Sequence, residues 1–299
     1  MQVFQADLEK SRDFIYALFK RNASLEARGW LDEKQKQVEE DNSGKYLYLA
    51  FSAAPRFAGK KVLQLEPADL ANANELRPGF DPSVWTTAQT ARTLLLLSIP
   101  HQDQPVFLHK LNQLFATAEM SELVALYASL PLLPYPEAYK LRAAEGIRTN
   151  MGTVFEAIAL NNPYSADYLE EGAWNQMVLK TVFVGKPLYR IYGLEKRSNP
   201  TLARILSDYA HERWAAGRTV TPELWRPVGP FLDEVLLEDI KKVFSHPDQI
   251  QQEAAALACA QGSLTQSKEL LDAHPILKNK IETGELNWHY IGSNSLPAN

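Results

Sequence analysis

The sequence predicts an all-α fold, an irregular HEAT-like helical solenoid built from antiparallel helix pairs. Three observations lead to this prediction. Apolar residues recur every three or four positions through most of the 299-residue chain, which is the spacing of a buried stripe on a helix. Polar and apolar residues nowhere alternate for long enough to build a sheet. Proline repeatedly stands at the start of a helical stretch, where its missing N–H costs no hydrogen bond.

The first part of the chain predicts two helices, over residues 7–28 and 31–38, each charged along one side. A charged outer face suits the terminal pair of a helical stack. The polar segment 60–78, which proline interrupts twice, is expected to be a longer connection between helices. Apolar spacing over residues 84–98 then predicts a further helix with a buried face.

The clearest helix pair is expected over residues 247–271. There an alanine-rich helix ends at Gly262, and a second helix opens at Thr265. The units show no strict sequence period, so the repeats are expected to be irregular. A compact helical bundle is the alternative architecture, because one long helix over residues 166–184 would fit it nearly as well.

No shift in composition divides the chain into independent domains. We therefore expect one all-helical domain over residues 1–283, with its most distinctive part at 149–218. The polar end of the chain, residues 284–299, is predicted to be a poorly ordered tail. Within that tail, Trp288 and Tyr290 are expected to dock on the last helices.

Charge and cysteine content narrow the possible functions. The net charge of −5 argues against nucleic-acid binding, which needs a basic face. The single cysteine, Cys259, lies among small residues, so we expect a buried and inert thiol. The first 13 residues do not resemble a secretory signal, and no uncharged run is long enough to span a bilayer. We expect a cytoplasmic protein without a transmembrane segment, peripheral at the inner membrane only through partners.

One part of the chain departs from the overall acidity. Residues 190–226 hold seven basic and four acidic side chains, a local charge of +3. A solvated helical face is the simpler interpretation and is favoured over an anion-binding patch.

Helix 200–215 carries a polar cluster that consists of Arg204, Asp208, His211 and Glu212. An acid three residues before a histidine lies on the same helical face, a geometry that metal sites and general-base pairs both use. No other histidine stands at a recognised metal-ligand spacing, and no nucleophile, phosphate-loop or dinucleotide motif occurs. We therefore expect no metal and no cofactor, with Arg204 and Asp208 as an ion pair within one helix.

A second set of polar residues lies inside apolar helices. The helix over 173–184 is apolar nearly all round and yet contains Asn175 and Lys180. A buried lysine needs a partner, and Glu156, the one charge in its own apolar helix, is the natural candidate. This pair has two interpretations of about equal weight, a structural ion pair or part of a ligand site.

Several segments of this central part resemble a known family. The runs NMGTVFEAIALNNPY, AWNQMVLK, GKPLYRIYGL and LSDYAHERWAAGR resemble the EboA family of bacterial metabolite-traffic proteins. The resemblance implies movement of a biosynthetic precursor from the cytoplasm toward the periplasm. It also implies protein partners of the same pathway, among them a membrane prenyltransferase-like protein. It supplies no catalytic signature that could be placed on these residues.

Together these observations predict a non-catalytic scaffold that binds a small metabolite, a partner protein, or both. Aromatic walls with a few polar groups suit a small ligand. The ligand-binding residues predicted on this basis are Phe155, Glu156, Asn162, Trp174, Asn175, Lys180, His211 and Trp214. The alternative is an enzyme that uses Glu156, Lys180, Asp208 or His211 as acid and base.

Overall fold

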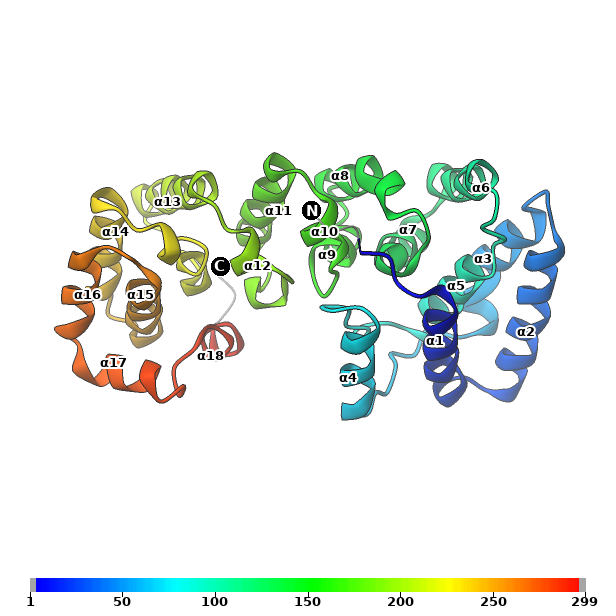
Figure 1. The fold of residues 1–299 in the computed structure, drawn as a ribbon, viewed down its shortest axis with the longest axis horizontal. Coiled ribbons are helices and arrows are strands. Elements are labelled where there is room, and N and C mark those ends of the chain that lie inside the picture. The colour runs from blue at the N-terminus through cyan, green and yellow to red at the C-terminus, as the bar shows by residue number, and fades with distance from the viewer. Residues whose placement is uncertain (1–3, 296–299) are drawn as a thin grey trace. The chain divides into compact units, whose positions relative to one another are not determined.

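The computed structural model describes residues 4–295, and the elements within this range are helices (Figure 1). No strand occurs in this range, although Val62 and Thr86 form one isolated antiparallel bridge. The predicted all-α class is therefore confirmed. The contacts divide the chain into two compact units, residues 1–170 and 171–299, which are described separately below.

The first unit begins with two helices where the sequence predicted one over residues 7–28. Ser24 accepts the backbone N–H of Ala27 at 3.2 Å and so caps a new helix directly after the first has ended. The segment 60–78 also differs from prediction, because Pro67 starts a helix there. Glu66 and Asp69 form a reciprocal capping box around that start. The helices of this unit are α1 (Leu8–Asn22), α2 (Leu25–Glu40), α3 (Lys45–Phe57), α4 (Pro67–Leu76), α5 (Thr87–Leu97), α6 (Gln104–Thr117), α7 (Met120–Ser129), η1 (Leu130–Leu132), η2 (Pro136–Tyr139), α8 (Lys140–Arg148), α9 (Gly152–Ala159) and α10 (Tyr164–Tyr168).

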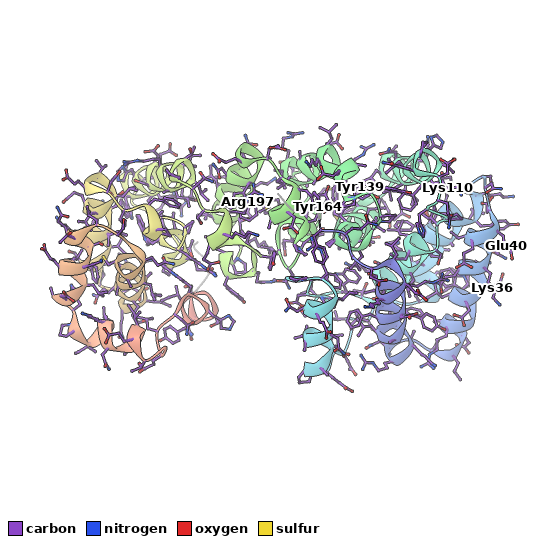
Figure 2. All side chains as sticks on the ribbon, in the orientation of Figure 1. Lys36, Glu40, Lys110, Tyr139, Tyr164 and Arg197 are labelled. Carbon is purple, nitrogen blue, oxygen red and sulfur yellow. The ribbon has the colours of Figure 1, made fainter. Side chains whose placement is uncertain are left out.

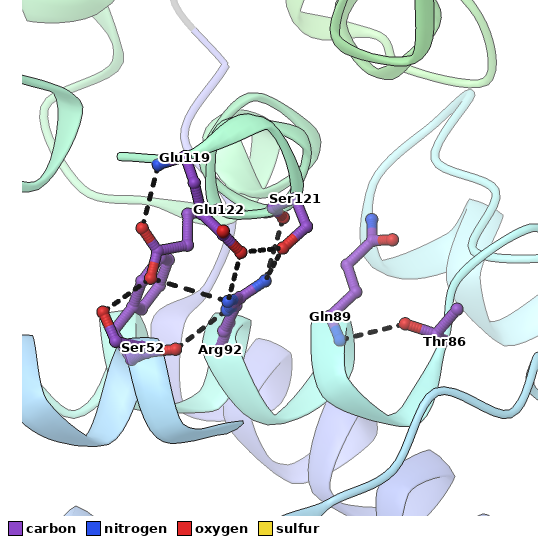
Figure 3. Close-up of polar contacts among 8 residues, drawn as sticks. Ser52, Thr86, Gln89, Arg92, Glu119, Ser121 and Glu122 are labelled. Atoms are coloured by element: carbon purple, nitrogen blue, oxygen red, sulfur yellow. Dashed lines mark hydrogen bonds and ion pairs between the residues drawn. The ribbon is translucent and has the colours of Figure 1, made fainter. Parts of the chain in front are cut away.

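Helix α5 is the centre of the first unit and contacts α1, α2, α3 and α7. Because helices surround α5 on several sides, its polar residues are buried as well as its apolar ones. Arg92, for example, is 2% exposed. The Arg92 guanidinium donates to the carbonyl of Phe51 and to the carbonyl of Ser121, each at 2.9 Å (Figure 3). The carboxylate of Glu122 lies 3.6 Å away. Arg92 thus joins α3, α5 and α7, and burial lowers the pKa of its guanidinium.

The second unit is built around the alanine-rich α15 (Gln249–Gln261), which contacts α14, α16, α17, α18, η4 and η5. Small side chains let η5 approach it closely, since a Cβ on Gly229 would lie 2.8 Å from the Cα of Ala258. As predicted, this helix ends before Gly262, and the next begins at Thr265. The other helices of this unit are α11 (Glu171–Phe183), η3 (Leu188–Arg190), α12 (Leu194–Arg197), α13 (Pro200–Ala215), η4 (Pro222–Trp225), η5 (Gly229–Phe231), α14 (Glu234–Phe244), α16 (Thr265–Asp272), α17 (Pro275–Glu282) and α18 (Trp288–Asn294).

Three further expectations concern this unit. The single long helix over residues 166–184 is wrong, because α10 ends at Tyr168 and α11 begins at Glu171. Cys259 is buried, and burial raises the pKa of its thiol to about 12, which suits the inert role predicted for it. Within the expected tail, residues 288–294 form α18, in which Trp288 is buried and Tyr290 is exposed. Residues 296–299 of the tail lie outside the described range.

None of the helices within residues 4–295 combines the length and the apolar character that a membrane span requires. The HEAT-like pairing and the single domain over residues 1–283 remain predictions.

Candidate functional site

The predicted site residues of the first unit lie on α9 and in the turn that follows it. Phe155 is buried, and Glu156 is half-buried. The Asn162 amide donates to the carbonyls of Tyr127 and Ala157 at 3.0 and 2.8 Å, while its oxygen accepts the backbone N–H of Tyr164 at 3.0 Å. Because all these partners belong to the chain itself, Asn162 holds the turn between α9 and α10 against α7.

The same turn explains two further sequence features. Asn161 adopts the left-handed conformation, with φ of 55°, which asparagine tolerates better than most residues at a helix end. The turn delivers Tyr164 into the interior, where it lies near Tyr139 (Figure 2) and stacks on Tyr168 with ring centroids 4.7 Å apart. Burial raises the pKa of both Tyr139 and Tyr164. These tyrosines are part of the packed core of the first unit.

Three predicted residues lie on α11 of the second unit. Trp174 is fully buried, and the Arg197 guanidinium lies 5.0 Å from its ring centroid. Asn175 exchanges hydrogen bonds with Asn199, which also caps α13 by accepting the backbone N–H of Leu202 at 2.9 Å. Lys180 is half-buried, and burial lowers the pKa of its ammonium group. Trp174 and Asn175 therefore support the packing of α11 on α12 and α13.

Glu156 belongs to the first unit and Lys180 to the second. Their pairing remains a prediction.

The polar cluster on α13 differs from prediction in its ion pair. Arg204 pairs with Asp233, the N-cap residue of α14, and not with Asp208 on its own helix. Asp208 and Glu212 are exposed. An arginine is long enough to reach a carboxylate on the neighbouring helix. Asp233 also caps α14, because its side chain accepts the backbone N–H groups of Val235 and Leu236.

His211 is the member of the cluster that makes a specific contact. Its Nε2 lies 2.5 Å from Oδ1 of the buried Asp239 on α14, and the other oxygen of Asp239 accepts the hydroxyl of Ser207 at 2.6 Å. The serine is bonded to the carboxylate rather than to the imidazole. A Ser-His-Asp nucleophile requires the opposite order, with the imidazole next to the hydroxyl. This arrangement joins α13 to α14 and does not activate Ser207.

Trp214, one turn further along α13, is the centre of an aromatic cluster. Its ring stacks on Trp225 with centroids 5.8 Å apart and lies 5.7 Å from the imidazole of His211. The Lys242 ammonium lies 4.0 Å from the Trp214 ring centroid, within the range of a cation–π contact. Two predicted residues, His211 and Trp214, thus lie together with Trp225 and with Lys242 of α14.

A groove of about 430 Å³ opens beside Trp214, within the size range of small-molecule sites. Its walls come from the end of α13, the loop after it, the end of α14 and the start of α15. The lining residues are Trp214, Gly217, Arg218, Thr219, Val220, Lys242, Val243, Ser245, His246, Pro247 and Gln251.

The loop that forms one wall of this groove is held at three points. Gly217 is left-handed, with φ of 68°, and ends α13 in a Schellman motif. Arg213 then donates to the carbonyl of Thr219 at 3.2 Å. On the other side, the buried Gln251 of α15 donates to the carbonyl of Val220 at 2.9 Å. The wall is therefore formed before any ligand arrives.

Sequence reasoning identified Trp214 but missed the groove's other side. Lys242 and His246 stand about thirty residues further along the chain, Lys242 on α14 and His246 in the loop that follows this helix. The apolar spacing of α14 shows which of its faces is buried, but not which neighbour that face meets. Arg218 belongs to the basic stretch 190–226, for which a solvated helical face is the simpler interpretation of the sequence, and its side chain is exposed.

Comparison with known proteins gives one match. Residues 11–229 match the model of the family described as "Metabolite traffic protein EboA". This range includes α13, the loop after it and Trp225, whereas the α14 and α15 side of the groove follows it. Searches against curated proteins and against solved structures gave no match.

Proposed function

Because the chain belongs to the EboA family of metabolite traffic proteins, we propose that it serves this traffic by binding a small metabolite without changing it chemically. The groove beside Trp214 is the site we propose for that ligand. Metabolite traffic itself follows from the family, while the ligand site and the absence of catalysis are the proposal.

The observation that carries the proposal is the construction of the groove. It is concave, it has an aromatic wall, and its loop is tied to both neighbouring helices by Arg213 and Gln251. A preformed wall reduces the conformational entropy that is lost on binding, which favours the binding of a small ligand. Two of the predicted residues meet here, because Trp214 lines the groove and His211 packs against Trp214.

The other residues that the sequence predicts to bind the ligand do not line this groove, and their contribution to binding is proposed separately. Glu156 and Lys180 are only half-buried, so Glu156→Gln and Lys180→Met remove charge at a small packing cost. Loss of ligand binding in either variant would support a contribution from these residues. Trp174 is fully buried, so its loss would report on folding rather than on binding.

We further propose a cytoplasmic location and contacts with proteins of the same pathway, including a membrane prenyltransferase-like protein. In this scheme the chain presents a precursor to the step that moves it toward the periplasm. The family description supports this scheme only in its general sense, the traffic of a metabolite.

Genetic complementation tests the proposal. Cells that depend on this protein would carry Trp214→Ala or the control Trp30→Ala, a half-buried tryptophan of the first unit that stacks on Phe57. We expect the Trp214 variant to lose metabolite traffic while remaining folded, and the Trp30 variant to keep it. Full complementation by a folded Trp214→Ala protein would exclude the groove as the functional site.

The alternative proposal is an enzyme. One observation favours it, the short contact between His211 and Asp239, because a carboxylate that orients an imidazole is a common feature of general bases. In that case His211→Ala would abolish function although the protein still folds and binds its ligand. Retention of substantial function by His211→Ala would support the binding role.

A further inference from the structure

The groove beside Trp214 is lined by cationic and neutral residues. Arg218 and Lys242 line it together with His246, and none of its lining residues is an aspartate or glutamate. The chain as a whole has 36 acidic and 31 basic residues. A site without carboxylates is therefore a local departure from the overall acidity.

From this arrangement we infer that the groove selects a small organic anion, with a carboxylate or phosphate group attached to an apolar body. The inference rests on the proposed function, because it names the chemical class of the ligand at the same site. Three steps support it: the state of the cations, the donor offered by His246 and the apolar wall.

The two strong cations of the groove have no carboxylate partner within the described residues. Lys241, the neighbour of Lys242, pairs with Glu238 at 2.7 Å, whereas Lys242 lies over Trp214 instead. Asp239 stands one turn before Lys242, but its two oxygens are bonded by His211 and Ser207. An ammonium group held over an aromatic ring keeps its hydrogen-bond donors available for an anion.

His246 adds a hydrogen-bond donor to the same groove. Its Nδ1 accepts the backbone N–H of Asp248 at 3.0 Å. With Nδ1 occupied as an acceptor, the ring proton is on Nε2, so the side chain offers an N–H group to a ligand even when it is uncharged. An anion in the groove can thus combine charge-assisted hydrogen bonds from Lys242 and Arg218 with a hydrogen bond from His246.

The remaining wall is apolar. Trp214, Val220, Val243 and Pro247 form it, and Val220 and Val243 are buried. Such a wall suits the carbon skeleton of a metabolite, while a free inorganic anion would leave it uncovered. The groove volume of about 430 Å³ suits a ligand of small size.

A pair of fluorescent probes separates the charge from the apolar body. Anilinonaphthalene sulfonate is a small organic anion, and N-phenyl-naphthylamine is its uncharged counterpart. Both would be titrated into the full-length protein, into the double variant Lys242→Met with Arg218→Met, and into Lys241→Met as the matched control on the same helix. Circular dichroism and thermal melting would establish that each variant is folded.

We expect the double variant to bind the sulfonate about tenfold more weakly, or worse, which is the effect of losing charge-assisted hydrogen bonds. Its affinity for the uncharged probe should change less than about twofold, and Lys241→Met should match the wild type with both probes. Added salt should weaken sulfonate binding by the wild type more than by the double variant. Equal sulfonate affinity in the wild type and the double variant would overturn the inference, as would the same loss in Lys241→Met.

Failure of the inference and failure of the proposed function give different results. If the probes show no charge selectivity but Trp214→Ala still abolishes traffic, the groove is functional and its ligand is not an anion. If charge selectivity is found but both Trp214→Ala and the double variant support traffic fully, the groove binds anions and the proposed function is wrong.

Discussion

Glu223 is the residue whose surroundings depart most from those of an ordinary carboxylate. It is 2% exposed and accepts the backbone N–H of Leu188 at 2.9 Å, while its Oε1 has no hydrogen-bond partner. Gly292 of α18 lies against it, since a Cβ there would approach Oε1 to 2.8 Å. Burial is the main cause that raises the pKa of Glu223 to about 7.

This shift predicts a pH dependence of stability. The folded-state pKa of Glu223 lies above the unfolded value of 4.5, so the folded state binds the extra proton. Protonation of Glu223 therefore stabilises the folded state fully below about pH 4.5, and this stabilisation is lost as the pH rises through about 7. The free energy of unfolding should fall by on the order of 3 kcal/mol over this range. Glu223→Gln carries no titrating proton. We expect urea unfolding to show that its stability relative to the wild type rises between mildly acidic and mildly basic pH; a constant difference between the two proteins would contradict this account.

Arg92 gives a second prediction at this scale. Its fork reaches two carbonyls and the Ser121 hydroxyl in fixed directions, as Figure 3 shows. Arg92→Lys keeps the charge but cannot satisfy this geometry, so we expect a loss on the order of 2 to 4 kcal/mol. Arg56→Lys, at an exposed position of α3, is the control and should change the free energy of unfolding by less than about 0.5 kcal/mol. If both variants lost less than about 0.5 kcal/mol in free energy of unfolding, the claim that Arg92 holds α3, α5 and α7 together would be wrong.

Among the elements, the end of α13 forms the groove wall through a left-handed glycine. Gly217→Ala should destabilise the protein by about 1 kcal/mol, because alanine is strained at a φ of 68°. Gly172 in α11 is the control, since a Cβ there meets no atom within 4 Å. Gly172→Ala should be neutral or stabilise by up to about 1 kcal/mol. Chemical denaturation of the two variants would compare them directly, and a loss in Gly172→Ala as large as in Gly217→Ala would refute the capping argument.

A proline at the start of a helical stretch predicted a helix correctly at some positions and not at others. Asn199 with Pro200 begins α13, as expected. At Asp81 the same signal gives only a turn, because the aspartate accepts the backbone N–H of Ser83 at 2.8 Å and the chain continues without a helix. The break after Tyr168 has neither proline nor glycine at Leu169 and Glu170, so nothing in the local sequence announced it.

For the whole molecule, the sequence predicted the helical class but not which side chains are partners across helices. Arg204 was assigned to Asp208 on the same helix, since spacing within a helix can be worked out from sequence. Its actual partner, Asp233, is set by how α13 and α14 pack. The contact of Lys242 with Trp214 has the same origin. Most of the groove therefore could not be found from one sequence, because it depends on long-range packing.

The single folding domain expected over residues 1–283 also remains to be tested. A single domain should unfold in one calorimetric transition. The two compact units, however, are built around different central helices, α5 and α15. If the chain is a single domain, Arg92→Lys and Gly217→Ala should both shift the same transition. Two transitions, each sensitive to only one of these variants, would show that the units unfold independently.

The central claim is that the groove beside Trp214 carries a small metabolite. Native mass spectrometry of protein purified from cells with an active pathway tests it most directly. We predict a bound small molecule on the wild type and on Trp30→Ala, and none on folded Trp214→Ala, because the aromatic wall of the groove supplies much of the burial energy. A small molecule retained equally by Trp214→Ala would contradict the claim.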